Sequence, residues 1–144
     1  MTAGAVSGQA GAAVNLSVSF DPGTASVSAL QFDLTMPPGL NAGSAAAGAI
    51  VGAAGKSLEV KLSGNAWKFI VFGFNKNVIS AGTLLTARVG IAPSTKVGAL
   101  KLPISHAVYS GPNGEAIASG ASKGGVVIVN PSVPKRSDRK FQKN

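Results

Sequence analysis

Residues 14–20, VNLSVSF, alternate strictly between apolar and polar side chains. Successive side chains of a β-strand point to opposite faces, so this stretch predicts a strand with one buried and one solvated face. Residues 30–36, LQFDLTM, and residues 58–62, LEVKL, repeat the pattern. Turn-forming sequences follow each stretch: DPG at 21–23, PPG at 37–39 and SGN at 63–65. The chain is therefore expected to be built from short, half-buried strands.

A second kind of strand is predicted at residues 67–74, WKFIVFGF, which are apolar on both faces apart from Lys68 and Gly73. Such a stretch is typical of a central strand, or of one with an exposed apolar face. Further strands are expected at 84–91, 100–108 and 126–129, with a weak one at 3–7. Residues 44–54 are the best helix candidate, although glycine and β-branched residues weaken it. The whole pattern predicts an all-β fold, a two-sheet β-sandwich with jelly-roll topology and about nine strands.

Length and charge indicate one folded domain and a basic end. The 144 residues suffice for a single core, which we place at residues 1–131. The net charge is +8, and half of it lies in residues 135–144, KRSDRKFQKN. We expect residues 132–144 to be a basic tail or linker. Neither a signal peptide nor an apolar stretch long enough to span a membrane is recognised.

The residue inventory is poor in groups that carry chemistry. The chain has no cysteine and one histidine, His106, which excludes disulfides, thiolate metal sites and multi-histidine sites. A catalytic carboxylate pair or a calcium site is not expected, because the acidic residues are few and scattered: Asp21, Asp33, Glu59, Glu115 and Asp138. We therefore predict a protein that is not an enzyme and binds no cofactor or metal.

Three local patterns invite a functional interpretation, but each lacks a feature that its chemistry needs. Gly55-Lys56-Ser57 looks like the end of a phosphate-binding loop, but Ile50 stands where that loop needs glycine. Ser105 and His106 are adjacent in a strand, where their side chains should point to opposite faces rather than form a nucleophile–base pair. Lysine residues are scattered instead of interleaved with aromatics, so nucleic-acid binding is not expected.

The order of these motifs resembles the cohesin domains of cellulosomes, jelly-roll modules that capture dockerin domains. The likeness covers about residues 4–129 and rests on 11–18 (GAAVNLSV), 27–40 (VSALQFDLTMPPGL) and 68–74 (KFIVFGF). Residues 82–84, 100–102 and 124–126 fit the later strands in order. The resemblance implies a non-catalytic module of an extracellular or cell-surface protein, part of a larger secreted chain, which binds a dockerin-type protein through one sheet face.

The resemblance also implies where that partner binds. In the cohesin family, the partner contacts polar positions of the third strand, apolar positions of the sixth strand and the loop before the last strand. By resemblance, those positions are here Ala29, Gln31, Gly73 and Gly114. We extend this predicted contact set along the same strands and the following loop, to Asp33, Phe69, Val71, Asn75 and Lys76.

Two other functions are compatible with the sequence. One is a structural module of a secreted, pilus or secretin-type assembly, which would space or dock its neighbours. The other is a carbohydrate-binding module, which would need Trp67 and Tyr109 exposed in one plane; a small-molecule ligand is otherwise not expected.

Overall fold

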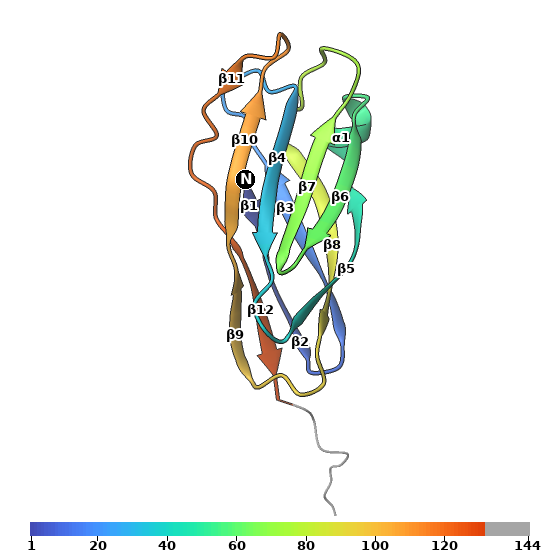
Figure 1. The fold of residues 1–144 in the computed structure, drawn as a ribbon, viewed down its shortest axis with the longest axis vertical. Helices are drawn as coiled ribbons and strands as arrows, with labels where there is room; N and C mark the ends of the chain where they lie inside the picture. Colours follow the sequence, from blue (N-terminus) through green and yellow to red (C-terminus); the bar gives the residue numbers. More distant parts are fainter. Residues whose placement is uncertain (132–144) are drawn as a thin grey trace, which may run out of the picture.

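The computed structural model describes residues 1–131 as an elongated β-sandwich (Figure 1). One layer is a five-stranded sheet, in the order β11 (Ala116–Ile117), β10 (Ile104–Ser110), β4 (Ala29–Thr35), β7 (Ala66–Phe72) and β6 (Ser57–Ser63). The facing layer is a four-stranded sheet, in the order β1 (Thr2–Ala3), β3 (Ala13–Phe20), β8 (Gly82–Ile91) and β5 (Leu40–Ala47). The expected tail, 132–144, lies outside the described residues.

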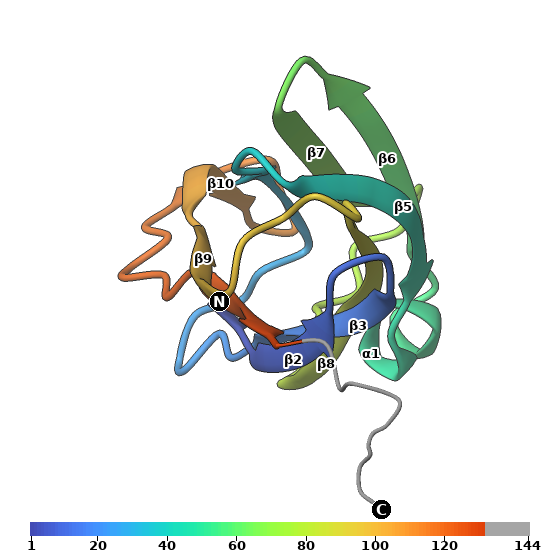
Figure 2. The same ribbon diagram turned by 90° about the horizontal axis from the view of Figure 1, so that it is seen from below.

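A third, smaller sheet was not expected. It consists of β2 (Ala5–Gln9), β12 (Gly125–Asn130) and β9 (Gly98–Leu102), with β12 parallel to β2 and antiparallel to β9. It lies in the lower part of the sandwich (Figure 1) and closes one of its sides in the view along the long axis (Figure 2). The predicted all-β sandwich is therefore confirmed, with three hydrogen-bonded sheets instead of two.

The core forms where the inward faces of the alternating strands meet. Leu16, Val18 and Phe20 are buried from β3, and Leu30, Phe32 and Leu34 from β4, as alternation predicts. The largest side chain, Trp67 on β7, is buried beside Phe69 at a ring distance of 5.0 Å. Because Trp67 and Tyr109 are both buried, they cannot form the exposed aromatic plane that the carbohydrate-binding alternative requires.

The helix candidate at residues 44–54, within the Ala/Gly-rich segment 40–55, is wrong for part of its length. Residues 44–47 belong to the strand β5, and only Ala49–Ala53 (α1) are helical. A side chain at Gly43 would press on the carbonyl oxygen of Arg88 in β8, which shows how closely the two strands approach. Small residues are required there, and they leave no apolar–polar alternation to detect.

The predicted strand 100–108 is also two strands. Pro103, which has no N–H to donate, separates β9 in the small sheet from β10 in the five-stranded sheet. Within residues 1–131, no helix has the length and apolar character needed to cross a membrane.

Candidate functional site

The five-stranded sheet presents an outer face that no other layer of residues 1–131 covers. Directly paired residues of antiparallel strands share a face, so the register defines its rows. In one row Val108, Gln31, Ile70 and Glu59 lie side by side on β10, β4, β7 and β6. We call the surface made by these four residues together with Ala29, Asp33, Lys61, Lys68, Phe72 and His106 the outer face.

The centre of the outer face is apolar. Val108 is 50% exposed, and Ile70 and Phe72 are half-buried. Phe74, just beyond β7, is fully exposed, and its ring lies 6.5 Å from that of Phe72 in an edge-on arrangement. Apolar and aromatic side chains surrounded by polar ones are typical of a protein-binding surface.

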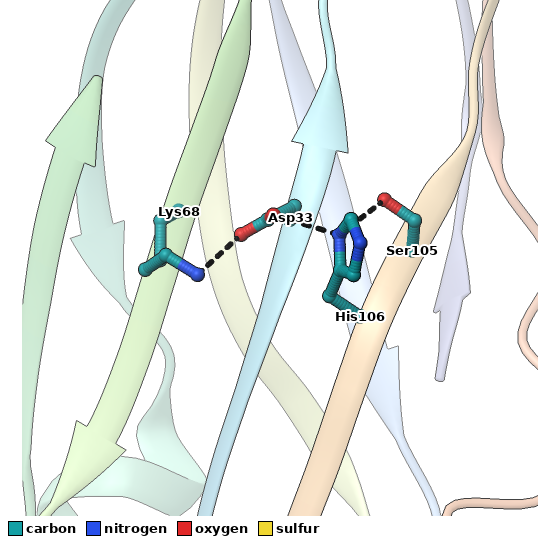
Figure 3. Close-up of polar contacts among 4 residues, drawn as sticks. All are labelled: Asp33, Lys68, Ser105 and His106. Atoms are coloured by element: carbon teal, nitrogen blue, oxygen red, sulfur yellow. Dashed lines mark hydrogen bonds and ion pairs between the residues drawn. The ribbon is translucent and has the colours of Figure 1, made fainter. Parts of the chain in front are cut away.

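A polar cluster borders this apolar centre (Figure 3). Asp33 on β4 is nearly buried, and its two carboxylate oxygens contact different strands. Oδ1 lies 3.0 Å from Lys68 Nζ on β7. The two groups form an ion pair, but their angles do not meet the geometry of a hydrogen bond. Oδ2 lies 3.0 Å from His106 Nδ1 on β10. Asp33 lies on the polar face of an alternating strand, where a solvated carboxylate is usual. Its contacts with Lys68 and His106 explain why it can be buried instead.

Ser105 and His106 do not diverge as a regular strand requires. Ser105 Oγ lies 3.3 Å from His106 Nδ1, because a β-bulge between Ser105 and Val108 places His106 at φ 52° and turns both side chains outward. Serine, histidine and aspartate therefore meet, but Ser105 and Asp33 contact the same ring nitrogen. A catalytic triad needs the two on opposite nitrogens, so this geometry does not activate the hydroxyl.

The structure divides the predicted contact residues into three groups. Ala29, Gln31 and Asp33 lie on the outer face. Phe69 and Val71 point the other way and are completely buried, so their prediction as partner contacts is wrong. The strand 67–74 is apolar on both faces, and sequence alone could not tell which set of alternating residues faces inward.

The remaining predicted residues gather in loops at one end of the outer face. Asn75 and Lys76 follow β7, and Gly114 lies in the turn between β10 and β11. Lys76 Nζ donates a hydrogen bond to Asn113 Oδ1 over 3.2 Å, which joins the two loops. Gly73 is half-buried beneath them, against the side chain of Lys56.

The sequence singles out Lys56 only through the incomplete phosphate-loop pattern at 55–57, and not for the structural role that it has. Lys56 is buried, and its Nζ donates hydrogen bonds to the carbonyl oxygen of Asn75 and to Ser28 Oγ, over 2.9 and 3.0 Å. Ser28 Oγ in turn donates to the carbonyl oxygen of Asn77. The lysine thus fixes the loop that carries Phe74 and Lys76 to the body of the domain.

We expect buried Lys56 to make the unfolding free energy of the domain depend on pH in the alkaline range. Burial lowers the pKa of its amine below the usual 10.5, so the unfolded chain retains the proton over a pH range in which the folded chain releases it. Unfolding free energy should therefore rise with pH in that range. The measurement is the difference in urea-unfolding free energy between the wild type and Lys56→Met from pH 7 to 10. A difference that stays constant with pH would contradict this role of burial.

Comparison with solved structures shows what this arrangement resembles. The chain superposes on the seventh ScaB type I cohesin from Pseudobacteroides cellulosolvens with a TM-score of 0.79, at 17% identity and 96% coverage of both chains. The chain has a cohesin-like fold. A non-cellulosomal cohesin from Archaeoglobus fulgidus gives a TM-score of 0.76, at 15% identity over 90% of this chain and 89% of that one.

Several similar cohesins were solved with a bound dockerin. The sixth cohesin from scaffoldin B of Acetivibrio cellulolyticus, in complex with a Cel5 dockerin mutant, has 20% identity and a TM-score of 0.76, covering 90% of this chain and 96% of that one. No family model matches the sequence, and no curated protein matches it. At these identities the comparisons establish the cohesin-like fold predicted from the sequence, and the fold alone.

Proposed function

We propose that this cohesin-like domain is a non-catalytic protein-interaction module that binds a dockerin-type domain through the outer face. Residues 1–131 form the binding module, and residues 132–144 are a linker to another part of a secreted or cell-surface protein. The observation that carries the proposal is the uncovered sheet surface with Val108, Ile70 and Phe72 at its centre.

The distribution of side chains supports this role. Exposed apolar groups supply contact area, while Gln31, Glu59 and Lys61 surround them with hydrogen-bonding and charged groups. Asp33 is fixed by neighbours on both sides and therefore keeps the border of the surface rigid. A preformed surface loses little conformational entropy on binding, which favours affinity.

Fold similarity supports the choice of partner. Several similar structures are cohesins solved in complex with dockerins, including the Acetivibrio cellulolyticus domain. A dockerin-type domain is thus the first partner class to test. The proposal also places the domain outside the cell, because a dockerin-binding module of a secreted or cell-surface protein would act there.

Ile70→Asp is the test of the outer face. Ile70 lies in the central row, and a carboxylate there would be desolvated against apolar partner groups. We expect binding to a dockerin from the source organism, measured by isothermal titration calorimetry, to weaken at least about 30-fold, as for a central interface residue.

The matched control is Ile128→Asp. Ile128 lies on β12 in the small sheet and is 43% exposed, so it receives the same substitution away from the outer face. Ile128→Asp should bind the dockerin with the affinity of the wild type. Circular dichroism should show that both variants are folded. Equal losses in both variants, or the failure of every dockerin from the source organism to bind the wild type, would overturn the proposal.

A further inference from the structure

Strand β6 has a free edge. It ends the five-stranded sheet, and among residues 1–131 β7 is its only hydrogen-bonded neighbour (Figure 2). Six of its seven residues are exposed. An edge strand presents a row of unpaired N–H and C=O groups that can accept another strand, unless side chains prevent it.

The sequence of β6 is self-complementary. Residues 57–63 read SLEVKLS, which is symmetric in chemical character about Val60. If two copies lie antiparallel with Val60 opposite Val60, then Glu59 faces Lys61 of the other copy, and Lys61 faces its Glu59. In the same register, leucine faces leucine at 58 and 62, and serine faces serine at 57 and 63. Cross-strand pairs of these kinds stabilise a sheet.

Each face of the strand benefits from this pairing. Glu59 and Lys61 share the outer face with Ile70 and Lys68, whereas Leu58, Val60 and Leu62 lie on the core side. Val60 is 38% and Leu62 is 53% exposed, because the facing sheet does not cover them. A second β6 would place apolar side chains beside both residues. In a parallel in-register pairing, by contrast, Glu59 would lie beside Glu59 and Lys61 beside Lys61, which is unfavourable.

We propose that β6 is a self-association edge, at which two copies of this chain pair antiparallel about a two-fold axis through Val60. The occupant is a second copy because the charges of the strand complement their own two-fold image. The pairing joins two five-stranded sheets into one continuous sheet. A contact of one short strand on each side is small, so we expect a concentration-dependent equilibrium rather than a permanent dimer.

Charge reversal tests the proposed register. Glu59→Lys leaves only lysines at 59 and 61, and Lys61→Glu leaves only glutamates, so each single variant should repel its own copy. We expect sedimentation velocity to show monomers for both variants at concentrations where the wild type approaches twice its 14.2 kDa mass. An equimolar mixture of the two variants should form a dimer, since every lysine then faces a glutamate. The double variant Glu59→Lys/Lys61→Glu should also recover the dimer.

Lys101→Glu is the control for net charge. Lys101 is exposed on β9 and receives the same charge change as Lys61→Glu, so it should dimerise like the wild type. A wild type that remains monomeric up to about 1 mM would overturn the proposal. So would a dimer that persists in both single variants, because it would have to use another surface. These outcomes do not depend on dockerin binding, and the proposed function is unaffected by them.

Discussion

Phe69→Ala is expected to lower the free energy of unfolding by about 3–5 kcal/mol, the range for removing a buried aromatic ring. The Phe69 side chain is completely buried, and its ring centroid lies 5.1 Å from that of Phe32 and 5.0 Å from that of Trp67. Truncation removes contacts with both rings and leaves a cavity between the sheets. Equilibrium unfolding in urea, followed by tryptophan fluorescence, measures the loss.

Phe72→Ala is the matched control on the same strand. Phe72 lies on the opposite face of β7 and is half-buried at the surface, so the same truncation should cost less than about 1 kcal/mol. The two variants separate the core role of Phe69 from the contact role first predicted for it. Similar losses of stability in both would mean that the assignment of inner and outer faces is wrong.

Gly48→Ala should destabilise the domain by at least about 1–3 kcal/mol, the usual cost of forcing an added group into a packed site. A Cβ atom at Gly48 would overlap the carbonyl oxygen of Thr83 and would lie 2.6 Å from its carbonyl carbon. The Gly48 N–H also donates to the carbonyl oxygen of Leu84 over 2.7 Å, which holds the two segments together. Backbone atoms would have to move, and thermal unfolding should show a lower midpoint.

Gly52→Ala, four residues further along the chain, should have the opposite effect on stability. Gly52 lies inside α1, and no heavy atom of residues 1–131 beyond its own surroundings in the helix stands within 4 Å of the position that a Cβ would take. Alanine there should stabilise the domain by about 0.5–1 kcal/mol, because glycine loses more backbone entropy in a helix. A stabilising Gly48→Ala, or a destabilising Gly52→Ala, would show that the approach of α1 to β8 differs from this description.

Alternating strands were the most predictable part of the fold. Residues 14–20 and 58–62 lie in β3 and β6, and residues 30–35 lie in β4, since period-two alternation reports directly which side chains a sheet buries. Segment 40–47 was missed because its packing requires small residues, and alanine and glycine carry no alternation signal. Pro103 was overlooked as the point where one apolar run divides between two sheets.

The candidate site could be predicted only in part. Alternation in β4 placed Ala29, Gln31 and Asp33 together on one face, as the structure does. In 67–74 both faces are apolar, so the choice between Phe69 and Ile70 as surface residues depended on which side meets the second sheet. The structural role of Lys56 could not be predicted, because its partners are main-chain and hydroxyl oxygens from distant segments.

By itself, the sequence determined a strand-rich chain with solvated and apolar faces, few groups for catalysis and a self-complementary stretch at 57–63. These are local properties, fixed by the order of side chains along a strand. Only the tertiary structure decided that β6 ends its sheet, that Ile70 and Phe72 remain at the surface, and that a bulge brings Ser105, His106 and Asp33 together. Strand order, inner face and bulge position depend on contacts between residues far apart in the chain, which no local pattern contains.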